Sequence, residues 1–163
     1  NAEYIRALSP EAFSEIATQY FQLTGWEPIN LDFDVLSDLS SSIQERIEKL
    51  ADIVKLVDWL FNEEPAVETD PKEMKKISKS MSADKVADVL DLAIEQLEKC
   101  DWNEEVIGET INGIGQTLET KSQVPIRVAV TGRRIGLPLF KPMEILGRQK
   151  VVTRLQKARA DLG

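Results

Sequence analysis

Hydrophobic residues in the first sixty positions recur at three- and four-residue steps, which is the spacing of one face of an α-helix. Ser9 before Pro10 is typical of an N-cap followed by the first helical residue, and Gly25 predicts the end of that helix. The most regular pattern in the chain then predicts one continuous helix over residues 43–61. Its apolar positions are Ile43, Ile47, Leu50, Val54, Val57 and Phe61.

The segment NEEPAVETDP (62–71) interrupts this pattern, because it is acidic, contains two prolines and has no periodicity. We interpret it as the boundary between two helical subdomains, residues 1–66 and 67–163. The second subdomain begins with a short apolar stripe over 72–81. A helix capped by Ser82 follows it.

Two further helices are predicted in the second subdomain. Ile107, Ile111, Ile114 and Leu118 mark one, although three glycines weaken it. A terminal helix begins at about Arg148, after a stretch of short segments divided by proline and glycine. No alternating strand pattern is present, so the sequence predicts an all-α fold, a helical bundle in two small subdomains.

Charge is distributed unevenly along the 163 residues, whose net charge is −8. Residues 121–163 hold ten Lys or Arg against two carboxylates, a net charge of +8, and residues 1–120 therefore carry −16. A basic C-terminal quarter on an acidic body is typical of a protein with one face that meets a polyanion. The alternative is that two oppositely charged subdomains attract each other.

The absence of histidine and the single cysteine limit the catalytic and metal-binding chemistry open to this chain. With no His and one Cys (Cys100), the chain cannot form His-activated nucleophiles, His-ligated zinc or a Cys-rich zinc site, so we expect no metal, and few catalytic options are left. One cysteine also excludes an internal disulfide and favours a reducing, cytoplasmic location. We find neither a membrane span nor a signal peptide. The chain does not begin with Met, so we expect a piece of a longer protein.

Two arginines stand out because their predicted positions offer no partner. Arg46 borders the apolar stripe of the 43–61 helix, and no acid lies three or four residues away. Arg127 follows Pro125, which we interpret as the first helical residue, so a cation would face the positive end of the helix dipole at a cost of about 0.3–1 kcal/mol. Arg46 therefore reaches solvent, forms a salt bridge with another helix or meets a ligand. Arg127 meets an anionic or acceptor-rich partner, or a carboxylate from the acidic part of the chain.

Motifs along the whole chain resemble the C-terminal part of bacterial glutamyl-tRNA synthetases. The opening NAEYIRAL (1–8) resembles the exit from the catalytic half of that family, and IQERIEKLADI (43–53) resembles its first anticodon-binding subdomain. The C-terminal signature is the most specific part of the resemblance. It consists of PIRVAVTG (125–132), LPLF (137–140), ILG (145–147) and RL (154–155).

KISKS (76–80) differs in one letter from the nucleotide-binding loop of class I aminoacyl-tRNA synthetases. That family's loop precedes the equivalent of residues 1–8, whereas KISKS follows them by about seventy residues. No Gly-rich turn or parallel sheet accompanies it, as a nucleotide site of that type requires. We therefore interpret it as a lysine-rich turn of the predicted 72–81 helix.

The resemblance implies a helical cage that receives the anticodon of glutamate tRNA. Arg46 takes the position of an arginine that reads the third anticodon base, a cytosine; a glutamine there would suggest an enzyme that also charges glutamine tRNA. Arg127 takes the position of a second anticodon contact. The loop from Gly136 to Leu139 would pack against splayed bases. Contacts to phosphate are expected from Arg133, Arg134 and Lys141.

The function implied is anticodon recognition, with the catalytic half of the same polypeptide attaching glutamate by use of ATP and Mg²⁺. The expected partners are the anticodon stem-loop of glutamate tRNA and that catalytic half. The resemblance therefore implies no catalytic residue and no cofactor in this chain, and we expect a monomer. The alternative is a helical protein–protein adaptor or oligomerisation domain with a basic tail.

Overall fold

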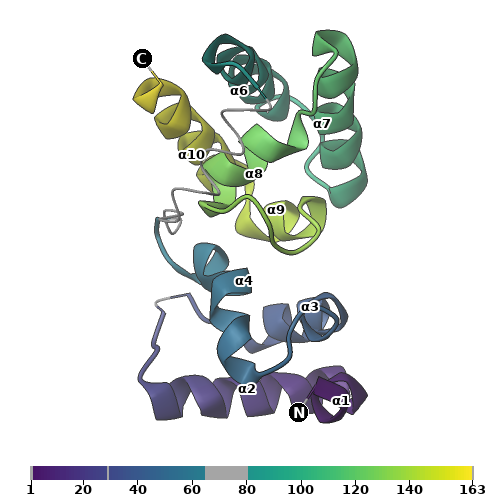
Figure 1. The fold of residues 1–163 in the computed structure, drawn as a ribbon, viewed down its shortest axis with the longest axis vertical. Helices are drawn as coiled ribbons and strands as arrows, with labels where there is room; N and C mark the ends of the chain where they lie inside the picture. Colours follow the sequence, from purple (N-terminus) through teal and green to yellow (C-terminus); the bar gives the residue numbers. More distant parts are fainter. Residues whose placement is uncertain (1, 29, 65–80, 163) are drawn as a thin grey trace. The chain divides into compact units, whose positions relative to one another are not determined.

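The computed structural model describes residues 2–28, 30–64 and 81–162, and every regular element in them is a helix (Figure 1). The predicted all-α fold is confirmed. The chain divides into two compact units, each described separately below. Unit 1 is Asn1–Glu64 with Gly136–Pro138, and unit 2 is Pro65–Ile135 with Leu139–Gly163. The predicted helix over 72–81, which contains KISKS, lies outside the described residues, and the subdomain bounds 1–66 and 67–163 stay a prediction.

Unit 1 begins as its sequence predicts. The side chain of Ser9 accepts a hydrogen bond from the N–H of Ala12 at 3.2 Å, Pro10 is the first helical residue, and Gly25 ends the helix with φ +76°. A left-handed backbone at that position favours glycine. The helices of unit 1 are α1 (Ala2–Ala7), α2 (Pro10–Thr24), α3 (Phe33–Gln44) and α4 (Ile53–Phe61), with a 3-10 turn, η1 (Leu50–Asp52), before α4.

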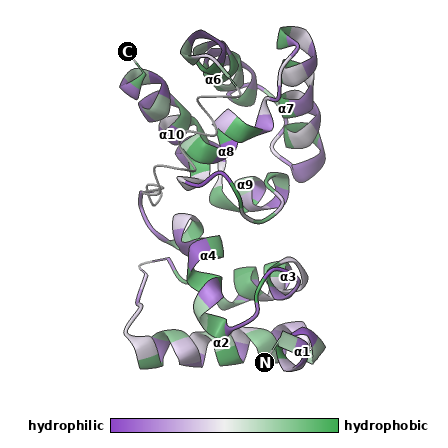
Figure 2. Cartoon of the chain, in the orientation of Figure 1, coloured by the Kyte–Doolittle hydropathy of each residue, from purple (hydrophilic) through white to green (hydrophobic). Residues whose placement is uncertain are grey.

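The core of unit 1 lies between α2 and α3, which pack against each other. Their apolar faces are fully buried, and Figure 2 shows hydrophobic and hydrophilic residues alternating along both helices. An aromatic pair, Phe21 and Trp26, closes the end of α2 with ring centroids 4.6 Å apart. At the other end, the Gln44 amide donates to the carbonyls of Ile5 at 2.6 Å and Leu8 at 3.0 Å, which fixes α1 against α3.

Unit 2 is built from five helices in the described residues. They are α6 (Ala83–Leu97), α7 (Glu104–Leu118), α8 (Gln123–Thr131), α9 (Phe140–Leu146) and α10 (Arg148–Asp161). Ser82 caps α6 by accepting from the N–H of Lys85 at 3.3 Å, as predicted. The terminal helix begins at Arg148, also as predicted. It packs against α6, α8 and α9.

Two arginines fix α10 to its neighbours. Arg154 is only 5% exposed, and its guanidinium donates to the carbonyl of Val130 at 2.9 Å, near the end of α8. Arg159 pairs with Asp91 of α6 at 2.8 Å. Both side chains belong to the basic C-terminal quarter of the sequence. Part of that charge therefore serves the packing of unit 2 rather than an external partner.

The glycines of α7, predicted to weaken it, allow two close approaches. A Cβ at Gly108 would lie 2.8 Å from the Phe140 ring of α9. A Cβ at Gly115 would lie 2.8 Å from the carbonyl oxygen of Thr120 and 2.9 Å from the Ser122 hydroxyl. Gly113, by contrast, has open space at that position. The helix is formed nonetheless, because Ile107, Ile111 and Ile114 are fully buried.

Candidate nucleic-acid interface

Arg46 lies in a turn, and the prediction of one helix over 43–61 is wrong. Helix α3 ends at Gln44, and α4 begins only at Ile53. The physical reason is the side chain of Asp52, which accepts hydrogen bonds from the backbone N–H groups of Glu48 at 3.1 Å and Lys49 at 3.2 Å. These bonds replace the helical ones at that point. The buried side chains of Ile47 and Ile53 still face the core, so the apolar spacing survives the break.

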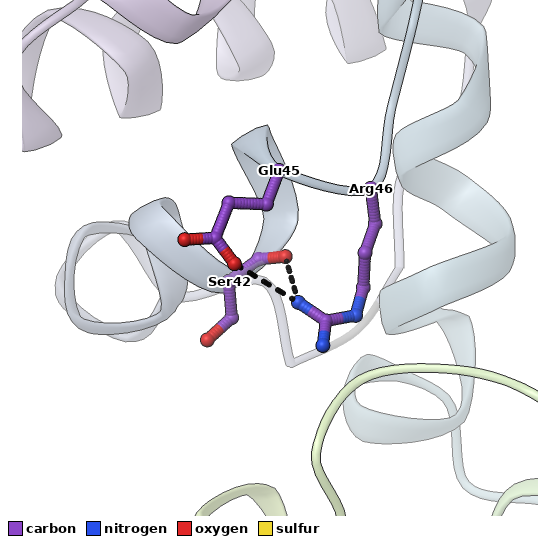
Figure 3. A network of polar contacts seen from close by, with 3 residues as sticks. All are labelled: Ser42, Glu45 and Arg46. Atoms are coloured by element: carbon purple, nitrogen blue, oxygen red, sulfur yellow. Dashed lines mark hydrogen bonds and ion pairs between the residues drawn. The ribbon is translucent and has the colours of Figure 1, made fainter.

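The guanidinium of Arg46 closes the C-terminal end of α3. Its Nη1 donates to the carbonyl of Ser42 at 2.9 Å and lies 3.6 Å from the carboxylate of Glu45 (Figure 3). The expectation that no local acid pairs with Arg46 is therefore wrong. It was based on helical neighbours, whereas in this turn the adjacent residue reaches the guanidinium.

The rest of the Arg46 guanidinium is available for a ligand. Its other two nitrogen atoms, Nε and Nη2, lie on the side away from Ser42 and Glu45 (Figure 3). Within the described residues these two nitrogens have no hydrogen-bond partner, and the side chain is 36% exposed. One guanidinium edge is thus fixed by the protein, and the other presents paired N–H donors in a plane.

The carboxylate of Asp52 gives this turn a pH dependence. Hydrogen bonds from the backbone N–H groups of Glu48 and Lys49, and then the charges of Lys49 and Lys55, hold the pKa of Asp52 below its ordinary value of 3.8. A group with a lowered pKa in the folded state stabilises the fold above its unfolded value. That stabilisation is lost as the pH falls through the folded value, so it is present at neutral pH and absent in strong acid.

We expect Asp52→Asn to lower the midpoint of thermal unfolding at neutral pH, because a neutral amide accepts these hydrogen bonds less strongly than a carboxylate. The difference from the wild type should shrink as the pH falls below 3.8. Far-UV circular dichroism at a series of pH values measures it. Asp38→Asn is the matched control, since it removes the same charge from an exposed position on α3. Equal effects of both substitutions would contradict the role given to Asp52.

Arg127 lies in the second turn of α8, and its predicted place in the first turn is wrong. Helix α8 begins at Gln123, so Pro125 is its third residue rather than its first. The start is earlier because the buried Ser122 hydroxyl donates to the carbonyl of Ile111 at 2.6 Å and anchors the chain on α7. Arg127 is half-buried, and the helix-dipole argument for an external partner no longer applies to it.

Arg133 and Arg134 follow the end of α8, where Gly132 adopts a left-handed backbone with φ +78°. The Thr131 hydroxyl lies 2.8 Å from the carbonyl of Arg127 and accepts from the N–H of Arg133 at 3.1 Å. This hydroxyl holds the turn in shape, a role that the sequence did not reveal. Both arginines are half-buried and make contacts within the protein.

The remaining predicted residues lie in the loop and helix that follow. Gly136 is half-buried, Lys141 is half-buried in the first turn of α9, and Leu139 is only 3% exposed. The Leu139 side chain therefore belongs to the core. Ile135, 67% exposed, is the apolar side chain that this loop presents to solvent, and sequence reasoning missed it. The sequence signal for it was the run RRIG (133–136), in which this apolar residue stands between an arginine and a glycine of a loop.

The described residues contain neither a candidate metal site nor a helix that could cross a membrane. They contain no group of three or more His, Cys, Asp or Glu residues that could hold a metal ion. Among them, no helix is long and apolar enough to cross a membrane. Arg46 and Gly136 belong to unit 1, and the other candidates belong to unit 2, so the structure presents two sets of candidate residues; the unit 2 set is Arg127, Arg133, Arg134, Leu139 and Lys141.

Comparison with known proteins identifies a family and several relatives that this chain resembles. A family model described as an anticodon binding domain matches residues 11–159. A glutamate–tRNA ligase of Frankia casuarinae is 37% identical over 99% of this chain, which covers 34% of that protein. A glutamate–tRNA ligase of Salinispora arenicola is 36% identical over 99% of the chain and 35% of its own length. The chain thus spans about a third of the length of the curated relatives it matches.

A solved structure shows the same fold. The glutamate tRNA ligase of Elizabethkingia meningosepticum, determined in complex with its amino acid, superposes with a TM-score of 0.80. The likeness covers all of this chain and 31% of that one, at 21% sequence identity. At this identity the likeness supports the helical architecture alone.

Proposed function

The chain belongs to the anticodon-binding domain family, and from this premise we propose that it is the region of a glutamate–tRNA ligase that recognises the anticodon of glutamate tRNA. The observation that carries the proposal is the end-to-end match. Residues 11–159 fit the family model, and proteins named glutamate–tRNA ligase align with 99% of the chain. Attachment of glutamate, with ATP and Mg²⁺, would take place in a part of the protein outside this chain.

Arg46 is the residue that we propose reads the third anticodon base. The Watson–Crick edge of cytosine has acceptors at O2 and N3, and the unpartnered edge of the guanidinium has matching donors at Nε and Nη2. Bases in a single-stranded loop can be unstacked and read in this way. The contact of Nη1 with Ser42 limits rotation of the guanidinium before the base arrives. Less conformational entropy is therefore lost on binding.

The second set of residues would hold the anticodon loop without reading its sequence. Arg133, Arg134 and Lys141 are cations near the end of α8 and the start of α9, and phosphate contacts from such side chains contribute mainly salt-dependent affinity. We propose Arg127 as a further anticodon contact, from a half-buried position on α8. In unit 2, the backbone at Leu139 and the exposed Ile135 side chain would support an unstacked base, and in unit 1 the backbone at Gly136 would serve in the same way.

Titration of the chain with two RNAs tests this function. One is the anticodon stem-loop of glutamate tRNA, and the other differs only in its third anticodon base. We expect tighter binding of the first, with a difference of about 1–3 kcal/mol, which is typical for loss of one bidentate contact to a base. Equal binding of both, or binding of neither, would contradict anticodon recognition and favour the alternative of a protein–protein adaptor.

A further inference from the structure

The ion pair between Arg46 and Glu45 occupies one side of the guanidinium only. The carboxylate of Glu45 lies 3.6 Å from Nη1, the same nitrogen atom that donates to the Ser42 carbonyl at 2.9 Å (Figure 3). The Glu45 side chain is 73% exposed, and an ion pair in such a position contributes little to stability. The carboxylate therefore matters less for the fold than for a ligand that approaches the open edge of Arg46, formed by Nε and Nη2.

The charges of the turn around Arg46 cancel. Residues 45–55 hold three carboxylates and three cations, so their net charge is zero. The remainder of residues 1–64 has ten carboxylates and one cation, a net charge of −9. Without the charge of Glu45 the turn would carry +1 and would attract phosphate. With it, the turn offers the donors of Arg46 but no net attraction for an anion.

A guanidinium edge does not by itself distinguish a base from a phosphate. Both present acceptors to its paired donors, and the negative charge of the phosphate makes its hydrogen bonds to arginine stronger. An anticodon loop carries a phosphate beside every base, so an RNA with the wrong third base can still bind Arg46 through its backbone. Such binding would weaken the discrimination that Arg46 provides.

The carboxylate of Glu45 opposes a phosphate at this edge much more than it opposes a cytosine. A phosphate bonded to Nε or Nη2 would lie across the guanidinium from Glu45, at a separation comparable with the screening length of about 8 Å at physiological ionic strength. Two negative charges repel each other there, whereas the edge of a neutral base brings no charge. Repulsion between like charges is a common means of excluding a wrong partner.

We propose that Glu45 is a specificity-determining residue, whose carboxylate hinders binding of phosphate to Arg46 and leaves its open edge to the third anticodon base. This inference rests on the proposed function, because it assumes that Arg46 reads a base of the anticodon loop. Glu45 acts on the RNA through its charge and does not touch the base. It raises the preference for the cognate RNA while it lowers the affinity for every RNA.

Removal of the Glu45 charge tests the inference. Glu45→Gln is titrated with the anticodon stem-loop of glutamate tRNA and with the RNA that differs only in its third anticodon base, over a series of salt concentrations. We expect both to bind more tightly and the wrong RNA to gain more, so the ratio of the affinities should fall by about 2- to 5-fold, the size expected for two charges at this separation. For the wrong RNA, the slope of log K against log salt should steepen by about 0.7, as for one added phosphate contact.

Three further variants separate the charge of Glu45 from its other effects. Glu45→Asp keeps the charge on a shorter side chain, so the ratio and the salt slope should stay near their wild-type values. Glu15→Gln removes the same charge from an exposed position on α2, and it should leave the ratio unchanged. In an Arg46→Gln background, Glu45→Gln should also leave the ratio unchanged, because no guanidinium edge is then present to bind phosphate.

An unchanged or higher ratio in Glu45→Gln would overturn the inference. So would an equal fall in Glu15→Gln or Glu45→Asp, or a fall that persists in the Arg46→Gln background. In these cases the wild type still prefers the cognate RNA, and the proposed function stands. If the wild type binds both RNAs equally, the proposed function fails and the inference fails with it. Circular dichroism checks the fold, which should be kept because Glu45 ends α3 through its backbone N–H, bonded to the carbonyls of Ser41 and Ile43.

Discussion

Arg46→Gln should remove most of the discrimination at the third anticodon base. Glutamine has a single amide in place of the guanidinium, so it cannot present two parallel donors while it also closes the end of α3 at Ser42. We expect the preference for the cytosine-containing stem-loop to fall by about 1–3 kcal/mol, which is roughly 5- to 150-fold in relative affinity. Fluorescence titration of the two RNAs measures it in this chain.

The loss of one positive charge must be separated from the loss of base reading. Arg6→Gln removes the same charge from an exposed arginine of unit 1, and it should leave the ratio of the two affinities unchanged. If Arg46→Gln weakened both RNAs equally, Arg46 would be a phosphate contact, and the reading of the third base would have to be assigned to another residue.

Gly115→Ala and Gly113→Ala should change stability in opposite directions, although both place a methyl group on α7. The Cβ at position 115 meets a backbone oxygen at 2.8 Å, and the nearby Ser122 hydroxyl is held by its bond to Ile111. Overpacking of this kind costs about 1–3 kcal/mol in the free energy of unfolding. At position 113 there is open space, so the higher helix propensity of alanine should stabilise the chain by about 0.5–1 kcal/mol.

Urea denaturation of the two variants, followed by circular dichroism, tests this pair. The substitution, the helix and the reference state are the same in both, so differences in the unfolded chain largely cancel. A stabilised Gly115→Ala variant would show that the chain between α7 and α8 moves away at little cost. That result would also weaken the explanation given for the early start of α8, because the same Ser122 contact carries it.

Local signals in the sequence predicted helices α2, α6, α7 and α10, whereas α1, α3 and α9 were not predicted. Ser9, Pro10 and Gly25 define the ends of α2, and Ser82 defines the start of α6, because a cap depends on a few neighbouring residues. The family resemblance located Arg46 and Arg127 as candidates, and their contacts with RNA stay predictions. What the sequence could not reveal was how each arginine is held. That depends on contacts made after the chain has folded.

Two errors show the limits of periodicity. Apolar residues at 43, 47, 50 and 54 keep a helical spacing across a turn, since both flanking segments must face one core. Only the side chain of Asp52 distinguishes the turn from a helix, and an aspartate at that position is compatible with either. In the same way, Pro125 is acceptable at more than one position of a first helical turn. The bond between Ser122 and α7, eleven residues away, decides its place.

The two hydrogen bonds of Gln44 have a consequence for the order in which unit 1 folds. Helix α1 has six residues, too few to persist alone in water, and it is fixed by an amide that follows it by 39 positions. Docking of α1 must therefore wait until the C-terminal end of α3 exists. In a kinetic experiment, contacts of α1 should be absent from the folding transition state. The first helix of the chain would be among the last to form, joined to the residue two places before Arg46.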